Sequence, residues 1–413
     1  MSRSLNIILL ILALLVAAGL LGGLVWANTR YVRTRPVEKD FLVPWLGART
    51  FLQYGDSPYS GPATQRAQVV YYGRLAGVHE DPLRLWLPMP FELFYFPFAL
   101  VPDYALARAI WMTCLEIALV ALGFLSLRLT DWKPARTLLP FILLFPLFWV
   151  YGALPLVNGS GTGFLALALV GALLALHDQK DELAGALLLL AAGAPRIVGI
   201  FLFFLIWWLI YHRRWRVFWG FLMSLALLLA LSFLLLPNWF LPFLSGVASH
   251  ASFVRSLSSL EIFASWSPVV GLRLGWVLIV GLLLALFIEW GGTLRKGYRH
   301  FAWTIGLSLA VIPLLGIPLA TQDFVFLFIP VAVLLGIMAE RWSRPRRWGV
   351  AGITLLIILA GSWLLAIEMR AVSAYEALPD SLFLVLPVML TIGLYWMRWW
   401  YLSLPHTELE TSQ

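Results

Sequence analysis

The sequence predicts an all-α protein, a polytopic transmembrane helical bundle, and three observations lead to this prediction. Hydrophobic residues make up 61% of the 413 residues and charged residues 12%, whereas soluble globular chains have about half apolar and about a quarter charged residues. Aromatic residues reach 15%, and many lie near the ends of apolar runs, where such side chains anchor a protein at the membrane interface. The apolar runs are also as long as membrane spans.

A helix needs about 20 apolar residues to cross the hydrocarbon layer. Runs near this length occupy 5–27, 104–127, 136–156, 162–177, 216–236, 271–289, 301–320, 323–340, 348–368 and 381–398. The first run is longer than the core of a signal peptide, so we expect an uncleaved span. With the interrupted segment 183–212, we expect about 10–12 membrane helices.

Basic residues gather in the short loops between the runs, and this pattern predicts the topology. They are Lys133, Arg136, Lys180, Arg213, Arg214, Arg216, Arg295, Lys296, Arg344, Arg346 and Arg347. The positive-inside rule makes these loops cytoplasmic in a multi-pass protein of the cell membrane. Both termini, including a tail at 405–413, are then cytoplasmic, and two long connections are exoplasmic, namely 28–103, with short helices, and 237–270. We therefore interpret the net charge of +8 as a topology signal and expect no nucleic-acid partner.

The apolar segment 183–212 lies between two loops predicted to be cytoplasmic, so an even number of passes is needed. Two full spans do not fit in its length, and Gly193-Ala194-Pro195 interrupts the helical pattern. A re-entrant pair of short helices is the prediction, and its tip is expected to face a cavity. The alternative is one long kinked helix. Residues 1–404 are expected to form a single domain.

The first long connection begins with cations, Arg33 and Arg35 among them, close to Asp40. A carboxylate among cations can act as a general base beside a phosphate-binding site. The alternative is a solvated loop next to the membrane.

Further candidates stand at the predicted tip and on the outer side. Burying the charge of Arg196 at the predicted tip is costly, so this residue indicates a cavity or a partner. The alternative is that its side chain reaches the membrane interface or pairs with a nearby carboxylate. In a stretch that can form an interfacial helix, Arg255 suits an anionic ligand, whereas His250 is more often a surface histidine. Asp323, after Gln322, begins a span, where helix capping is the more common role of an acid.

Several motifs occur in a recognisable order. Asp40-Phe41 follows the first span, and a small-residue stretch at 47–49, a Gly-x-x-Pro-Tyr turn at 55–59, an aromatic-Tyr-Pro segment at 94–97 and a helix entry at 101–111 come next. Ala184-Gly185 then opens the broken segment and 213–216 ends it. This order resembles integral-membrane glycosyltransferases of the GT-C fold, most closely glycosyltransferase family 87, over roughly 1–340.

Two departures from the family pattern bear on activity. Gly159-Ser160 stands where the family commonly has Gly-Gln, and Ala194-Pro195 where it has Lys-Pro. Arg196, one position along, could supply the missing charge.

The resemblance implies a GT-C-like transferase that depends on a polyprenyl-phosphate sugar, is similar to mannosyltransferases, and works in glycolipid biosynthesis of the cell envelope. It implies that a hexose or pentose moves with inversion to a lipid or glycan acceptor on the exoplasmic face, with Asp40 as general base. Donor-phosphate candidates are Arg33, Arg35, Arg196 and Arg255, and expected pocket residues are Tyr59, Tyr95, Asn158, Ser160, His250, Gln322 and Asp323. No cofactor or metal is obligatory for this chemistry, although the sequence leaves a divalent metal open. The donor, the acceptor and the bilayer are the expected partners.

Two other functions stay open at this point. A transporter or flippase of a lipid-linked anion would use Arg196 as a midplane site, but it usually has paired repeats with matching broken helices, and only one broken segment is found. An inactive GT-C-like scaffold is the second alternative, because the family Gln and Lys are missing.

Overall fold

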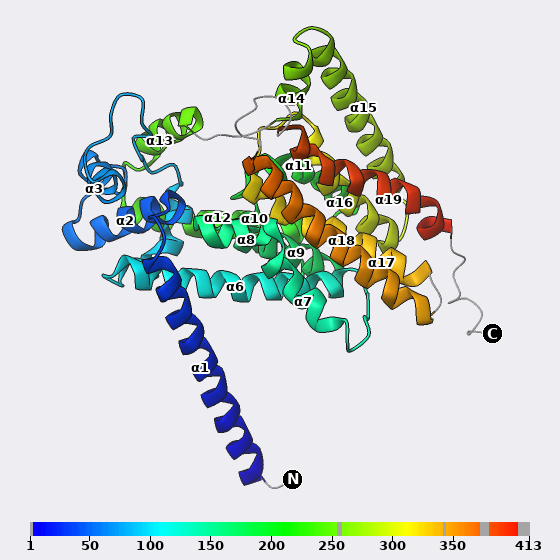
Figure 1. The fold of residues 1–413 in the computed structure, drawn as a ribbon, viewed down its shortest axis with the longest axis horizontal. Coiled ribbons are helices and arrows are strands. Elements are labelled where there is room, and N and C mark those ends of the chain that lie inside the picture. Colours follow the sequence, from blue (N-terminus) through cyan, green and yellow to red (C-terminus); the bar gives the residue numbers. More distant parts are fainter. Residues whose placement is uncertain (1–2, 254–257, 342–343, 372–379, 404–413) are drawn as a thin grey trace. The chain divides into compact units, whose positions relative to one another are not determined.

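The chain folds into helices, and the prediction of an all-α bundle is confirmed. The computed structural model describes residues 3–253, 258–341, 344–371 and 380–403, and these residues contain no strand (Figure 1). The chain divides into two compact units. Unit 1 comprises 1–117, 156–161 and 227–254, and unit 2 comprises 118–155, 162–226 and 255–413. The prediction of one domain over 1–404 stays a prediction.

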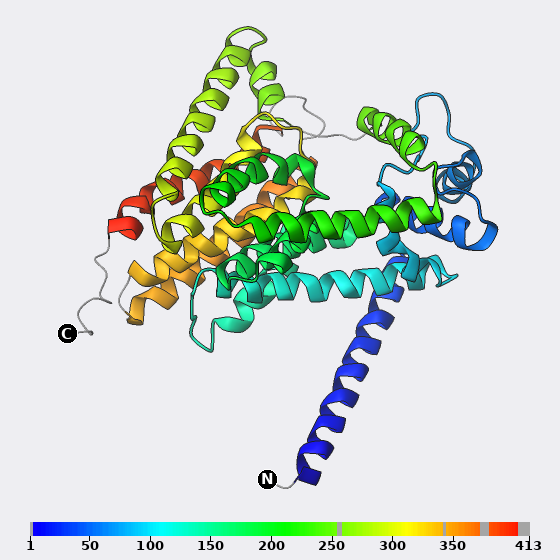
Figure 2. The ribbon, with the colours of Figure 1, turned by 180° about the vertical axis from the view of Figure 1, so that it is seen from behind.

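Unit 1 contains one long apolar helix and a set of short helices. These are α1 (Arg3–Arg33), α2 (Lys39–Tyr54), α3 (Gly61–Tyr72), α4 (Met89–Glu92), η1 (Leu93–Tyr95), α5 (Phe96–Ala99), the first half of α6 (Tyr104–Leu129), the end of α12 (Trp215–Leu235) and α13 (Phe240–Phe253). Asn28 of α1 donates to the side chains of Thr113 and Glu116 of α6, at 3.0 and 3.1 Å. Beyond that tie, α1 extends away from α2 and α3 in both views (Figures 1 and 2).

Unit 2 contains the remaining helices. They are α7 (Leu139–Phe148), most of α8 (Val150–Asn158), α9 (Thr162–His177), α10 (Asp181–Ala191), α11 (Pro195–Tyr211), α14 (Ser259–Trp266), α15 (Val270–Thr293), α16 (Tyr298–Val311), η2 (Ile312–Leu314), η3 (Thr321–Leu327), α17 (Phe328–Arg341), α18 (Arg344–Ala371), η5 (Asp380–Leu384) and α19 (Val385–Ser403). Helices α14 and α15 pack side by side as a hairpin (Figure 2). Residues 300–311 of α16 and most of α17 are buried.

Among the described residues, seven helices are long and apolar enough to cross a membrane, or eight if the bent pair α7 and α8 is one span. All ten predicted runs are helical, but some are shorter than expected. Helices α7 and α8 meet at 48° and carry Pro146 and Pro155, and α16 ends in a 3₁₀ turn that contains Pro313. Prolines therefore lower the count of full-length helices below the predicted 10–12.

The broken segment is helical on both sides of a break at 192–194, where the sequence predicts one. Pro195 stands at the first position of α11. This position is favourable for proline, because an N–H group there would have no hydrogen-bond partner within the helix. Helix α10 packs on α9, whereas α11 packs on α15 and α16. That the pair is re-entrant stays a prediction.

The Ala-Gly start of α10 has a structural reason. A Cβ atom at Gly185 would lie 2.1 Å from the carbonyl oxygen of Val217, and one at Gly220 would lie 2.2 Å from that of Glu182. Helices α10 and α12 therefore cross with their backbones in contact, as small residues allow in membrane helices.

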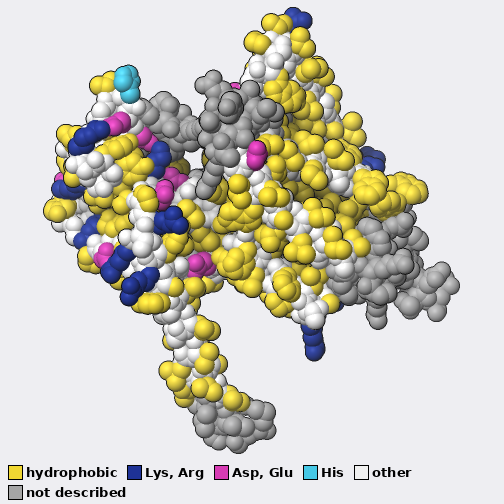
Figure 3. All heavy atoms as spheres, viewed as in Figure 1, with side chains coloured by type: hydrophobic (Ala, Val, Ile, Leu, Met, Phe, Trp, Pro, Cys, Tyr) yellow, Lys and Arg dark blue, Asp and Glu magenta, His cyan; other side chains and the backbone are white. Residues whose placement is uncertain are grey.

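The two units differ in surface chemistry. Charged side chains gather over α2 and α3 of unit 1, whereas the surface over α15 and α18 of unit 2 is mostly hydrophobic (Figure 3). Leu284 and Ile288 of α15 and Leu356 of α18 are 58–68% exposed. Such faces suit contact with lipid tails, in agreement with a multi-pass membrane protein.

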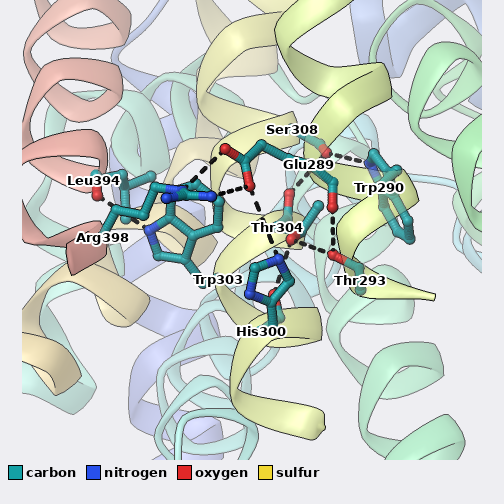
Figure 4. A network of polar contacts seen from close by, with 9 residues as sticks. All are labelled: Glu289, Trp290, Thr293, His300, Trp303, Thr304, Ser308, Leu394 and Arg398. Atoms are coloured by element: carbon teal, nitrogen blue, oxygen red, sulfur yellow. Dashed lines mark hydrogen bonds and ion pairs between the residues drawn. The ribbon is translucent and has the colours of Figure 1, made fainter. Parts of the chain in front are cut away.

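A polar network ties α15, α16 and α19 together inside unit 2 (Figure 4). Arg398 Nη2 donates to Glu289 Oε2 at 3.0 Å, and Nε lies 2.9 Å from Oε1. The guanidinium also lies over the ring of Trp303, 5.6 Å from its centroid. His300 Nε2 is 3.8 Å from Glu289 Oε2. The carboxylate of Glu289 thus faces groups from two other helices.

We predict that Glu289→Gln lowers the free energy of unfolding by about 2 kcal/mol, because it leaves Arg398 without its carboxylate. The value is below the usual cost of breaking a fully buried pair, since Arg398 is 38% exposed. Thermal unfolding in nanodiscs, followed by tryptophan fluorescence, measures it. The matched control is Glu340→Gln, which removes a half-exposed pair with Arg299 and is expected to cost under about 1 kcal/mol. Equal effects of the two substitutions would contradict a special role for Glu289.

Candidate functional site

The first turn of α2 presents an acidic residue, Asp40. The helix starts after Glu38, whose backbone is extended (φ −100°, ψ 128°), and it ends at Gly55, whose φ of +72° only glycine adopts without strain. Asp40 is half-buried. A carboxylate in the first turn is stabilised by the positive end of the helix dipole, so this position favours the charged form.

Aromatic rings enclose the residue that follows Asp40. Phe41 is fully buried, and its ring centroid lies 5.5–6.4 Å from those of Trp45, Tyr95, Tyr104 and Trp111. These rings come from α2, η1 and α6, so they fix the start of α2 against α6.

A guanidinium group lies in the same place, although the sequence analysis did not select it. Arg108 of α6 is 2% exposed, lies over the ring of Phe41, and donates from Nη2 to the carbonyl oxygens of Leu156 and Val157. These carbonyls belong to the last turn of α8, where basic side chains commonly bond free carbonyls. Among the described residues, Nη1 of Arg108 is buried and has no hydrogen-bond partner.

The loop after α8 is held tightly against these residues. Gly159 has a φ of +85°, and a Cβ atom there would lie 2.7 Å from Phe41 Cβ and 3.0 Å from Arg108 Cζ. Trp111 Nε1 donates to the carbonyl oxygen of Gly159 at 3.1 Å. Only glycine fits this position, because its φ is positive and because a Cβ atom would clash with Phe41 and Arg108. Ser160, which follows, is 8% exposed.

The charges of this cluster act on one another. Burial and the charge of Asp40 raise the pKa of Glu38, and the charge of Arg108 lowers it in part. Arg108 in turn interacts electrostatically with Glu38, Asp40, Tyr95 and Tyr104. The buried guanidinium of Arg108 therefore interacts with two half-buried carboxylates, and it favours the charged form of Glu38.

A second buried acid lies in unit 1. Glu92 is fully buried, and neither carboxyl oxygen has a hydrogen-bond partner among the described residues. Burial raises the pKa of Glu92 well above its usual range. Glu92 also interacts electrostatically with Tyr59 and Tyr95.

The cations predicted to hold a phosphate near Asp40 are engaged elsewhere. Arg33 forms an exposed ion pair with Asp103 at 3.2 Å, and Arg35 is exposed, with its guanidinium over the ring of Tyr31. Their phosphate-binding role stays a prediction.

The other predicted residues of unit 1 divide into two groups. Tyr95, buried and stacked on Trp111 at 4.5 Å, lies in the cluster, as does the loop of Asn158 and Ser160. Tyr59 donates to the carbonyl oxygen of Leu87 at 2.7 Å and lines a separate pocket. His250 lies in α13, but its side chain and all of Arg255 are outside the described residues.

Three predicted residues belong to unit 2. Arg196 is half-buried at the second position of α11. Asp323 accepts a hydrogen bond from the Ala320 amide at 3.0 Å, which is the capping role expected for it. The carbonyl oxygen of Gln322 accepts from Thr162 at 3.4 Å. Their contribution to a substrate pocket stays a prediction.

The cluster around Asp40 can take a proton and can hold an anion. Asp40 and Glu38 are carboxylates that accept protons, and Arg108 has a buried nitrogen with no hydrogen-bond partner among the described residues, of the kind that binds anions. In the part of the chain that the structure describes, no group of three or more His, Cys, Asp or Glu side chains lies close enough to hold a metal ion.

Seven helices among the described residues that are long and apolar enough to cross a bilayer define a multi-pass membrane protein. A family model described as glycosyltransferase family 87 matches residues 87–318, more than half of the chain. The chain belongs to glycosyltransferase family 87, as its motifs indicate, and is therefore a membrane glycosyltransferase. The match includes Arg108 and Gly159, whereas Asp40 precedes it. No curated protein and no solved structure shows a match to the chain.

Proposed function

We propose that this glycosyltransferase moves a sugar from a polyprenyl phosphate to a lipid or glycan acceptor on the exoplasmic face of the membrane, with inversion. The observation that supports this most is the half-buried Asp40 beside the buried Arg108 in a member of family 87.

In this proposal the acceptor hydroxyl oxygen forms a bond to the anomeric carbon as the bond from that carbon to the phosphate oxygen breaks. Asp40 takes the hydroxyl proton, and polyprenyl phosphate leaves with the bonding electrons. Arg108 Nη1 donates to the charge that develops on the phosphate, a type of contact that lowers barriers by several kcal/mol when it is preorganised. Asp40 lies in α2, which follows α1, and Arg108 lies near the start of α6, which suits a lipid-linked donor at the membrane boundary.

The test is sugar transfer by purified protein in nanodiscs. Radiolabelled polyprenyl-phosphate mannose, glucose, galactose and arabinose are offered with membrane-lipid acceptors, and the product is separated from the donor. We expect one of these donors to be used and nucleotide sugars, offered as controls, not to be used. Transfer from a nucleotide sugar would contradict the donor class. Absence of transfer with every donor would favour a transporter of a lipid-linked anion.

A further inference from the structure

A pocket with a volume of about 500 Å³ lies in unit 1, lined by α3, the chain at 75–85 and α13. Its polar lining consists of Tyr59, Thr64, Gln65, Gln68, Arg84 and Ser245. We refer to it as the α3–α13 pocket. Its volume is within the range of small-ligand sites, and none of its residues belongs to the cluster around Asp40.

The walls of the pocket are held by hydrogen bonds. Gln68, 9% exposed, donates from Nε2 to the carbonyl oxygen of Pro82 at 2.8 Å and accepts at Oε1 from the Ala76 amide at 3.1 Å. Arg84 Nη1 donates to Ser245 Oγ at 3.0 Å. The buried side chain of Gln68 therefore fixes one wall, and Arg84 connects that wall to α13.

Helix α13 closes the pocket through a close backbone contact. A Cβ atom at Gly246 would lie 2.0 Å from the carbonyl oxygen of Leu85, so α13 packs directly on the wall that contains Arg84. Pro242 and Ser245, on the same side of α13, line the pocket. The pocket is thus a built feature of unit 1.

The chemistry of the lining suits a saccharide. The lining includes amides, hydroxyls and one guanidinium but no carboxylate, and it also includes apolar surfaces of Leu75, Pro82 and Pro242. A sugar ring needs this combination, because its rim carries hydroxyls and its faces carry C–H groups. A metal cation has no charged ligand here, and a lipid tail would leave the amides without partners.

The position of α13 indicates that the ligand is attached to the membrane. Only residues 236–239 separate α13 from α12, a candidate span. The face of α13 beside the pocket edge is apolar and exposed, with Leu241 76%, Leu244 46% and Val247 39% exposed. A helix with such a face lies in the boundary between headgroups and acyl chains, which brings the pocket to the level of lipid headgroups.

We propose that the α3–α13 pocket binds the saccharide headgroup of a membrane-anchored glycan acceptor. The lining of the pocket indicates a saccharide, and only the identification of that saccharide as the acceptor rests on the proposed function. The pocket is separate from Asp40, so binding and transfer can be tested separately.

The decisive variant adds bulk at the lining of the pocket. Gly61 lines the pocket, and a Cβ atom there has nothing within 4 Å, so Gly61→Phe adds bulk into open space. The matched control is Gln53→Phe, at an exposed position of α2 outside the pocket. A second, conservative variant is Gln65→Ala, an exposed amide of the lining, with Gln53→Ala as its control.

Binding is measured by saturation-transfer NMR on protein in nanodiscs, with soluble oligosaccharides of mannose, glucose, galactose and arabinose and with inorganic phosphate. We expect at least one oligosaccharide to bind wild type and both Gln53 controls equally. Its affinity should fall about tenfold or more in Gly61→Phe and by a smaller factor in Gln65→Ala.

Three results would overturn the proposal. No oligosaccharide binds wild type, oligosaccharide binding persists unchanged in Gly61→Phe, or that substitution weakens the binding of phosphate but not of any oligosaccharide. Asp40→Asn is expected to keep saccharide binding. If binding is absent while Asp40-dependent transfer persists, only the pocket proposal fails. If Gly61→Phe removes binding while transfer does not depend on Asp40, only the proposed mechanism fails.

Discussion

Asp40→Asn is expected to reduce kcat for sugar transfer by about 10²–10⁴-fold, the contribution of a general base. Asparagine keeps the size of the side chain and its place in the first turn of α2, but it cannot take the hydroxyl proton. The donor KM should change little, because the phosphate contact is assigned to Arg108. Transfer from the donor selected above, measured at saturating acceptor, gives both constants.

The matched control for this substitution is Asp103→Asn. Asp103 belongs to the same connection between α1 and α6, but it is half-exposed and paired with Arg33 at the surface. Exposed pairs contribute under about 1 kcal/mol, so this variant should transfer sugar at nearly the wild-type rate. Wild-type kcat in Asp40→Asn would remove Asp40 from the mechanism while leaving the enzyme class unchanged.

Arg108→Met is expected to reduce kcat by about 100-fold or more, because it removes a preorganised donor from a water-excluded site. The same change removes the cation that faces Glu38 and Asp40. Without it the pKa of Glu38, which Arg108 lowers, rises further, so Glu38 protonates at higher pH. The acidic limb of the pH profile of kcat/KM should therefore move to higher pH, which a loss of fold alone would not produce.

Two further variants separate charge from structure. Arg108→Lys keeps the charge but not the paired bonds to the carbonyls of Leu156 and Val157, so its acidic limb should stay near that of wild type while kcat falls. Arg49→Met is the matched control, since Arg49 also donates to a backbone carbonyl, that of Ala99 at 3.0 Å, and stacks on Trp45. If Arg108→Met has the same acidic limb as Arg49→Met, the role of Arg108 is limited to packing.

The sequence predicted the helices and the break at 192–194 because these follow from local patterns. Apolar runs of span length and the proline at 195 act within one segment of chain. The number of full-length helices was predicted less well, since prolines such as Pro146 shorten apolar runs without changing their composition.

The site was predicted only in part, because its chemistry depends on contacts between distant segments. Asp40 was selected from its motif and from neighbouring cations, and its role stays a prediction. Of those cations, Arg33 pairs with Asp103 and Arg35 is exposed. Arg108 was missed because the search was directed at loops, whereas it lies inside an apolar run. An arginine in a predicted span was itself the available signal. Its contact with the loop at Gly159 depends on the tertiary fold, and no local pattern reports it.

The arrangement of unit 1 along the chain sets an order in which its parts can be completed. Asp40, Arg108 and Gly159 all precede residue 160, so this cluster can assemble before α13 has been synthesised. The α3–α13 pocket, in contrast, needs Ser245 and Gly246, which leave the ribosome many residues later. Because chains fold as they emerge, the nascent chain would complete the cluster around Asp40 first and the α3–α13 pocket second.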